Sequence, residues 1–226
     1  MKSERLFEGL PQVGGHAALD LMNTVEYRGA TDPRDHLKSV GQLLRWCELA
    51  ELLDKGEAGY LRELARHQPR AGEDALRGTI ELREVGRKVL AGKIRGEAHA
   101  RALDVLRHRI ELAARRVEIV VDESGTGFVR KYRIAGFESL VDRIALAIEE
   151  ALTVAARESL GECQAEDCDW LFFDRSRAGR RRWCHSGQCG NAERVRNFRT
   201  RGRAKAKSVE ALNGLCARKK HTLPKG

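Results

Sequence analysis

Four cysteines in the last third of the chain constrain its fold more than any other feature. They form two pairs, Cys163 with Cys168 and Cys184 with Cys189, with four residues inside each pair and fifteen between the pairs. Two such pairs separated by a loop are typical of tetrahedral zinc sites in intracellular proteins. Four thiolates complete the coordination of the ion and leave no open position for a substrate. The spacing therefore predicts one structural Zn²⁺ held by these four cysteines.

Two other interpretations of the cysteines stay open, namely disulfide bonds and buried free thiols. A reducing compartment disfavours disulfides, and the charged residues around the cysteines disfavour a buried cluster. His185 adjoins Cys184, but neighbouring side chains rarely point at one ion, so we expect it not to be a ligand. The segment has few apolar side chains, and structural zinc, which contributes about 10 to 16 kcal/mol of binding energy, is expected to fold it.

The positive charge of the chain is confined to the same region. The net charge is +9, yet residues 1–160 contain 26 Lys and Arg against 26 Asp and Glu, whereas residues 161–226 contain 16 against 7. A basic excess at one end is the electrostatic footprint of a protein that binds a polyanion. Nucleic acid is the first candidate and an anionic membrane surface the second, and a merely solvated tail is the structural alternative.

A helix over residues 190–208 would arrange these cations around a narrow ridge. At about 100° per residue, Val195 and Phe198 fall on one side, which we expect to pack on the zinc module, and Asn197 and Thr200 fall opposite, between two basic stripes. That cross-section suits a major groove about 12 Å wide. The alternative is a charged helix that holds RNA or a protein. The predicted nucleic-acid contacts are Arg175, Arg177, Arg180, Arg181, Arg182, Arg194, Arg196, Asn197, Arg199, Thr200, Arg201, Arg203, Lys205 and Lys207.

The rest of the chain reads as mainly helical. Apolar residues recur at helical spacing over residues 35–115, with breaks expected at Pro69 with Gly72 and at Gly92 with Gly96. A β-branched run over residues 117–121, a glycine-containing loop and an alternating run over 128–134 predict one β-hairpin. The final helix of this part is indicated by a wide apolar stripe. Its members are Phe137, Leu140, Val141, Ile144, Ile148, Leu152 and Ala155.

The zinc segment is expected to contain its own hairpin. Residues 170–174 look like a strand, residues 175–182 like a basic loop, and Trp183 like the return strand that leads into Cys184. Gly187 to Asn191 would open the basic helix and place Cys189 in its first turn.

These elements predict an α+β fold that is mainly helical, divided into three parts. Residues 1–160 would form a helical domain with one β-hairpin, because Gly161 can end the last helix where the composition becomes basic. Residues 161–208 would form the zinc module, with a hairpin and the basic helix, and residues 209–226 a basic tail that is partly disordered. The chain shows neither a signal peptide nor a membrane span, so we expect a cytoplasmic protein.

The zinc segment resembles the CGNR zinc-finger family. The matching residues run from Cys163-Gln-Ala-Glu-Asp-Cys168-Asp-Trp-Leu-Phe-Phe-Asp174 through Arg181-Arg-Trp-Cys184 to Cys189-Gly-Asn191 with Arg194-Val-Arg196. The stretch Ala18-Leu-Asp-Leu-Met-Asn-Thr-Val25 looks like the opening signature of ABATE, the domain that precedes the finger in this family. The resemblance implies a bacterial stress-induced transcription regulator whose finger binds DNA. One departure is Ala192, where the family's name motif has arginine.

A polar cluster interrupts the apolar stretch near the start of the chain. Asp20, Asn23, Thr24 and Arg28 could line a pocket for a small-molecule effector, or they could cap a helix and satisfy buried polar groups, which we favour. We expect no enzyme, because no phosphate loop, catalytic triad signature or second metal motif is visible.

The sequence thus favours a transcription regulator that binds double-stranded DNA through a structural four-cysteine zinc finger and a basic helix. An RNA- or protein-binding adaptor with a zinc-stabilised surface is the alternative. Ligand sensing and dimerisation are both open to the N-terminal domain, so the expected partners include a small-molecule effector and a second copy of the chain.

Overall fold

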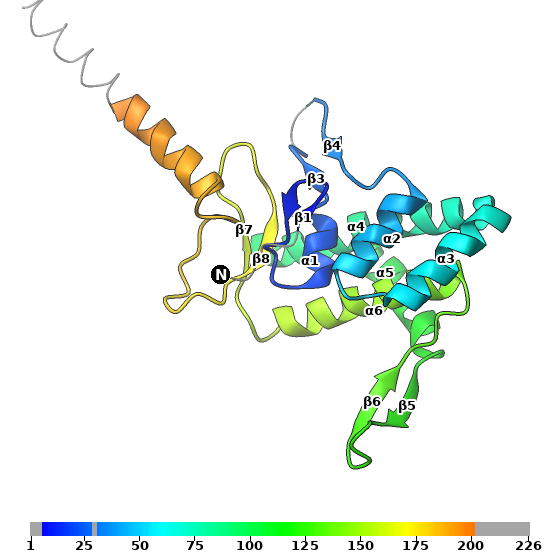
Figure 1. The fold of residues 1–226 in the computed structure, drawn as a ribbon. Helices are drawn as coiled ribbons and strands as arrows, with labels where there is room; N and C mark the ends of the chain where they lie inside the picture. Colours follow the sequence, from blue (N-terminus) through cyan, green and yellow to red (C-terminus); the bar gives the residue numbers. More distant parts are fainter. Residues whose placement is uncertain (1–5, 29–30, 202–226) are drawn as a thin grey trace, which may run out of the picture. The chain divides into compact units, whose positions relative to one another are not determined.

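The computed structural model describes residues 6–28 and 31–201 of the chain (Figure 1). These residues fall into two compact units, one that ends at Cys184 and one that starts at His185. The predicted contacts Arg203, Lys205 and Lys207 and the predicted tail, residues 209–226, lie outside the described residues. The elements of the first unit are β1 (Leu6–Phe7), β2 (Leu10–Pro11), α1 (Ala17–Met22), β3 (Val25–Glu26), β4 (Arg34–Asp35), α2 (Val40–Leu49), α3 (Lys55–His67), α4 (Pro69–Arg95), α5 (Ala100–Ala114), β5 (Glu118–Val121), β6 (Phe128–Lys131), α6 (Phe137–Ala155), β7 (Leu160–Glu162) and β8 (Leu171–Phe173).

The core of the first unit lies among its long helices. Helices α4, α5 and α6 pack on one another, and α1, α2 and α3 pack against α4 (Figure 1). The apolar stripe predicted for the last helix is confirmed in α6, where Phe137, Leu140, Ile144 and Ile148 are buried. Cys47 on α2 is also fully buried among these side chains, and burial raises the pKa of its thiol. None of the described helices is long and apolar enough to cross a membrane.

Helix α4 is longer than the glycine positions predict. Of the residues expected at the breaks, Pro69 begins α4 (Pro69–Arg95) and Gly96 caps its end in the left-handed conformation with φ 71°, as predicted, whereas Gly72 and Gly92 lie inside the helix. A Cβ atom on Gly72 would lie 3.1 Å from the Val40 side chain, so this glycine lets α2 approach α4 closely. A glycine inside a helix costs only about 1 kcal/mol, and packing along this helix outweighs that cost.

The strands form four separate two-stranded antiparallel sheets. The hairpin predicted near residue 120 is confirmed by β5 and β6, which pair from Glu118 with Lys131 to Val121 with Phe128. The short pairs β1–β2 and β3–β4 were not predicted, because two-residue strands leave no periodic pattern. The fourth pair, β7–β8, follows α6 and leads into the cysteine cluster.

Two boundary predictions in this last region are wrong. Helix α6 ends at Ala155, and Gly161 lies within strand β7 instead of ending the helix. Strand β8 confirms the strand expected near Trp170, but its partner is β7 and not Trp183, which lies outside any strand. The reason is steric: a Cβ atom on Gly161 would lie 2.7 Å from the Phe172 ring, so glycine lets the two strands close over that ring.

Candidate metal centre and nucleic-acid interface

The first cysteine pair lies in the loop that joins β7 to β8. Cys163 directly follows β7, and its N–H donates to the Trp170 carbonyl at 2.9 Å, which closes the base of the loop. The N–H of Cys168 donates to the Ala165 carbonyl at 3.1 Å and forms a tight turn within it. The hairpin therefore holds the backbone of both cysteines through its own hydrogen bonds.

This hairpin is built into the core of the helical body. The Asn23 side chain pairs with Leu171 of β8 as a strand would: its Oδ1 accepts from the Leu171 N–H and its Nδ2 donates to the Leu171 carbonyl, both at 2.9 Å. Trp170 Nε1 donates to the Val25 carbonyl at 3.1 Å. Leu171 and Phe173 are 0% and 1% exposed and belong to the main hydrophobic cluster. The body thus supplies the core that the zinc segment lacks.

Arg87 of α4 binds the other side of the loop between β7 and β8. Its guanidinium donates to the Asp169 carbonyl at 2.9 Å, to the Asp169 carboxylate at 2.7 Å and to Glu162 at 3.2 Å. Neither this contact nor the pairing of Asn23 with Leu171 was predicted, because the partners are 82 and 148 residues apart in the sequence. The one signal was an asparagine inside an apolar stretch.

The loop after β8 leads the chain back to Cys184. Asp174 closes this loop, since its carboxylate accepts from the N–H groups of Ser176 at 2.9 Å and Arg181 at 2.8 Å. The Arg181 guanidinium lies 4.2 Å from the centre of the Phe172 ring and donates to the Val13 carbonyl at 2.9 Å. It also donates to the Cys184 carbonyl. An arginine at the centre of the loop therefore fixes the backbone of the third cysteine.

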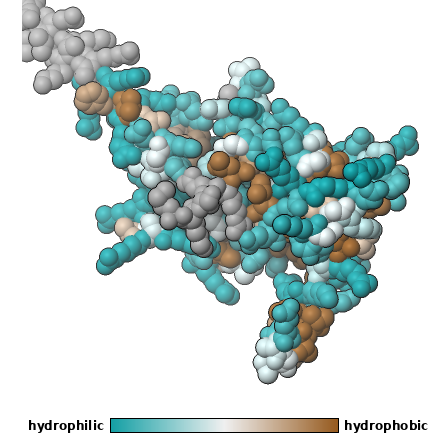
Figure 2. All heavy atoms as spheres, viewed as in Figure 1, coloured by the Kyte–Doolittle hydropathy of each residue, from teal (hydrophilic) through white to brown (hydrophobic). Residues whose placement is uncertain are grey.

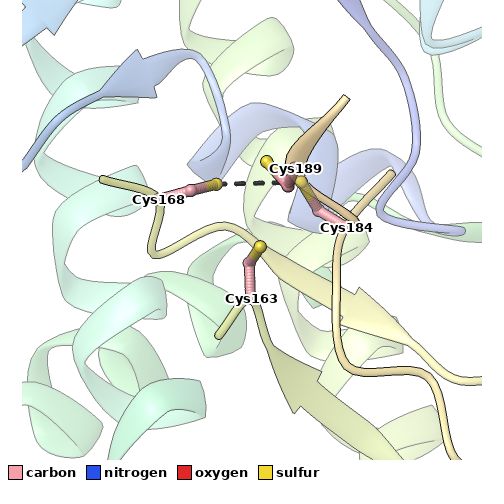
Figure 3. Close-up of side chains that lie close together, drawn as sticks. All are labelled: Cys163, Cys168, Cys184 and Cys189. Atoms are coloured by element: carbon pink, nitrogen blue, oxygen red, sulfur yellow. Dashed lines mark hydrogen bonds between the residues drawn. The ribbon is translucent and has the colours of Figure 1, made fainter. Parts of the chain in front are cut away.

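The four cysteines come together as their spacing predicts. The sulfur atoms of Cys163, Cys168, Cys184 and Cys189 all lie within 4.8 Å of one another (Figure 3). Ligands about 2.3 Å from a tetrahedral Zn²⁺ lie about 3.8 Å apart, and the Cys168 and Cys184 sulfurs are separated by 3.7 Å. This separation is far too long for a disulfide, which measures about 2.05 Å, and none of the four cysteines forms one. The cluster is a zinc site of four cysteines, and the ion it holds is structural.

The fourth cysteine starts the basic helix, which spans residues 189–201 and extends to the end of the described chain. The prediction that Cys189 lies in the first turn is therefore confirmed. The preceding turn is closed by His185, whose Nδ1 accepts from the Gln188 N–H at 3.1 Å and whose carbonyl accepts from the Gly190 N–H at 3.1 Å. Ala192, in place of the family's arginine, is exposed in this first turn.

Three of the five loop arginines predicted to bind nucleic acid make contacts within the protein. Besides Arg181, Arg175 donates to Glu158 at 2.8 Å and to the Gly15 carbonyl at 3.0 Å, and Arg182 donates to Gln164 at 2.7 Å. Arg177 and Arg180 are exposed at the tip of the loop. The loop therefore contains arginines that bind the fold, of which Arg175 and Arg182 are also exposed, and two exposed arginines, Arg177 and Arg180, whose side chains have no partner in the described chain.

The helix shows the same division. Arg194 donates to the Gly190 and Ser186 carbonyls, both at 3.0 Å, and Arg196 pairs with Glu193 at 2.5 Å. The Thr200 hydroxyl donates to the Arg196 carbonyl at 3.0 Å. Among the predicted residues on this helix, Asn197, Arg199 and Arg201 are exposed, and their side chains have no partner in the described chain.

The apolar side predicted for this helix is not buried. Val195 is 42% exposed and Phe198 is 79% exposed. The expectation that these two side chains are buried is therefore wrong, and the buried apolar side chains of the zinc segment include Leu171 and Phe173 of β8 instead.

The polar cluster near the start of the chain makes its contacts inside the body. Besides Asn23, Asp20 accepts from the Gly14 N–H at 2.8 Å, Thr24 accepts from Arg83 at 3.0 Å, and Arg28 donates to the Met22 carbonyl at 2.9 Å. Burial raises the pKa of Asp20 to about 7. None of the four lines the cavity of about 940 Å³ that lies between α3, α4, α5 and the start of α6.

Comparisons with known proteins divide the chain at the end of α6. Residues 15–158 match the family model of ABATE, described as "Putative stress-induced transcription regulator". Residues 159–202 match the model of the CGNR zinc finger. A comparison with curated proteins finds no match to the chain.

Proposed function

The chain belongs to the ABATE family and carries a CGNR zinc finger, and we propose on this basis that it regulates transcription by binding double-stranded DNA through the helix that starts at Cys189. The observation that carries the proposal is the exposure of Asn197, Arg199 and Arg201 on this helix, with no protein partner in the described chain. Unpaired cations and a short amide on one helix are the groups that contact phosphates and base edges.

The dimensions of the helix support this role. An α-helix with its side chains is about 10 to 12 Å across, and the major groove of B-DNA is about 12 Å wide. Asn197 can present its amide to a base edge, as asparagine does with adenine. Arg199 and Arg201 are two residues apart and so leave the helix in different directions, toward different phosphates.

The zinc loop adds a second electrostatic contact in this proposal. Arg177 and Arg180 are exposed at the tip of the loop, whose other arginines bind the fold. Each phosphate that a cation neutralises lowers the log of affinity by about 0.9 per log unit of salt on duplex DNA. A DNA-binding role therefore predicts a salt dependence that weakens when these arginines are removed one at a time.

The test compares variants of the full zinc-loaded protein on two nucleic acids. Binding to duplex fragments selected by the protein from a random library, and to structured RNA, is measured by fluorescence anisotropy at two salt concentrations. We expect Arg199→Ala to weaken duplex binding about tenfold and to reduce the salt slope by about one. Asn197→Ala should weaken binding to the selected sequence more than it weakens binding to random duplex, with a difference of about 1 to 3 kcal/mol.

The matched control is Arg101→Ala, which removes an exposed arginine with no partner in the described chain, on α5. It should leave duplex binding unchanged. If neither helix variant alters duplex binding while RNA binds more tightly, the chain is an RNA-binding adaptor and the groove model fails.

A further inference from the structure

The side chains of the basic helix, residues 189–201, divide into two groups by their contacts. Glu193, Arg196 and Thr200 bond within the helix: Arg196 donates to the Glu193 carboxylate at 2.5 Å, and the Thr200 hydroxyl donates to the Arg196 carbonyl at 3.0 Å. At about 100° per residue, these three side chains leave the helix within an arc of about 60°. The polar groups on that side of the helix are therefore engaged with one another.

The neighbouring arc of the helix carries Asn197, Arg201 and Phe198, in that order around the axis. They leave the helix at about 0°, 40° and 100° when Asn197 sets the origin. The Asn197 and Arg201 side chains have no partner in the described chain, whereas Arg194, which also falls in this arc, donates to carbonyls earlier in the chain. Phe198 is 79% exposed, and Figure 2 shows apolar atoms among the hydrophilic ones on this helix. This arc therefore presents an amide, a cation and an aromatic ring to solvent.

The charges around the Phe198 ring indicate what covers it. Arg201 lies on one side of the ring, at about 40°, and Arg199 on the other, at about 200°. Both arginines are exposed and have no partner in the described chain. A single exposed aromatic side chain needs no explanation, but this ring lies between two cations that attract a polyanion. The nucleic acid that these arginines bind in the proposed function therefore also covers the ring.

The major groove offers one apolar group to such a ring. This group is the 5-methyl of thymine, and phenylalanine is among the side chains that contact it. At the outer radius of a helix, about 5 to 6 Å, an angle of 100° separates the Asn197 and Phe198 side chains by about 8 Å, which corresponds to about two base-pair steps of 3.4 Å. One placement of the helix in the groove thus allows both side chains to reach base edges.

We propose that Phe198 packs on the 5-methyl group of a thymine, about two base pairs from the base that Asn197 contacts. This inference rests on the proposed function and deepens it, because it names a base that the helix recognises. In this contact the ring exchanges water for the methyl group, while Arg199 and Arg201 bind phosphates. Phe198 is then a specificity-determining residue, which distinguishes sequences and contributes little to binding of random duplex.

The test removes one methyl group at a time from the duplex sequence that the protein selects. Each thymine is replaced in turn by deoxyuridine, which pairs with adenine in the same way but lacks the 5-methyl group. Binding of the full zinc-loaded protein to each duplex is measured by fluorescence anisotropy. We expect one or two replacements to weaken binding about fourfold each, the amount that burial of one methyl group contributes, and the others to change it less than about 1.5-fold.

Substitutions of the ring connect this effect to Phe198. Phe198→Ala should bind the thymine and deoxyuridine duplexes equally at the sensitive positions, whereas Phe198→Leu keeps an apolar contact and should retain most of the difference. Val195→Ala is the matched control, because Val195 is an apolar residue of the same helix, 42% exposed, that lies outside the arc of Asn197, Arg201 and Phe198. It should leave the difference unchanged. Zinc content and circular dichroism confirm that each variant is folded.

The outcomes separate this inference from the proposed function. If the original protein binds no duplex DNA, both are overturned. If it binds a selected duplex in which no thymine is sensitive to loss of its methyl group, only the role of Phe198 is overturned. The same holds if Phe198→Ala keeps the difference between thymine and deoxyuridine, or if Val195→Ala abolishes it.

Discussion

The hairpin that carries the first cysteine pair and the helix that carries the last cysteine are stabilised in opposite ways. Strand β8 buries Leu171 and Phe173 in the helical core, whereas the helix over residues 189–201 exposes even Val195 and Phe198. The first region is held by packing and by paired hydrogen bonds, and the second starts at a metal ligand. The comparison teaches that the zinc ligands lie on two kinds of structure: three lie in or after a hairpin that is packed into the core, and the fourth begins a helix whose apolar side chains are exposed.

Removing a zinc ligand should produce the largest difference between the two regions in their response. Cys184→Ser should weaken zinc binding by more than about 100-fold, because a site of three thiolates loses a large part of the binding energy. The helical body should keep its circular dichroism signal, while amide hydrogens over residues 189–201 should exchange faster. Zinc competition and hydrogen exchange measure the two effects. Retention of zinc by this variant, or collapse of the whole body, would contradict the comparison.

The same substitution in each region should have different effects on stability. Asn23→Ala leaves the Leu171 N–H and carbonyl buried without partners, which should lower the free energy of unfolding by about 2 to 5 kcal/mol. Asn197→Ala, on the exposed helix, should change it by less than about 0.5 kcal/mol. Denaturant unfolding measures both, and equal losses would show that β8 is not held as described.

The pH dependence of stability should come partly from Asp20, which supports the loop that holds β8. Burial raises its pKa to about 7, so the folded protein keeps the Asp20 proton over a range, between about pH 4 and pH 7, in which the unfolded chain releases it. Stability is therefore highest below this window and falls as the pH rises through it, by a few kcal/mol at about 1.4 kcal/mol per pH unit. Asp20→Asn should flatten this slope in unfolding measured from pH 4 to pH 8. Identical slopes in the two proteins would be the contrary result.

The smallest effect is expected at the most exposed aromatic side chain. Phe198→Ala should change the free energy of unfolding by less than about 0.5 kcal/mol, since Phe198 is 79% exposed. Phe173→Ala is its counterpart in the packed region and should cost about 3 to 5 kcal/mol. Thermal melting distinguishes them, and a comparable loss at Phe198 would mean that the helix has a packed side after all.

Local patterns predicted the parts of this molecule that local residues determine. The stripe on α6, the β5–β6 hairpin and the four cysteines all follow from spacing within short windows. Gly72 was misread because its neighbour in the fold, Val40, lies on another helix, and the sequence around Gly72 gives no indication of that contact. The prediction that Trp183 lies in the partner strand was wrong because β8 pairs with β7, the strand that precedes it in the sequence.

The site residues show the same limit. Arginines that bind the fold and arginines that face solvent look identical in sequence, since Arg181 and Arg180 are neighbours with different environments. Asn23 stood out as polar, but its partner at Leu171 could not be predicted without the packing of β8. What distinguishes these side chains is distance in space, which spacing in the chain does not encode.

The place of β8 in the core has a consequence for how the protein is made. A ribosome that has synthesised the segment matched by the first family, residues 15–158, has not yet produced Leu171 and Phe173, which complete its hydrophobic interior. A contact across 148 residues also carries a large loop-closure entropy, which slows folding. The interior of the nascent helical body therefore stays incomplete until the first half of the zinc segment has been synthesised.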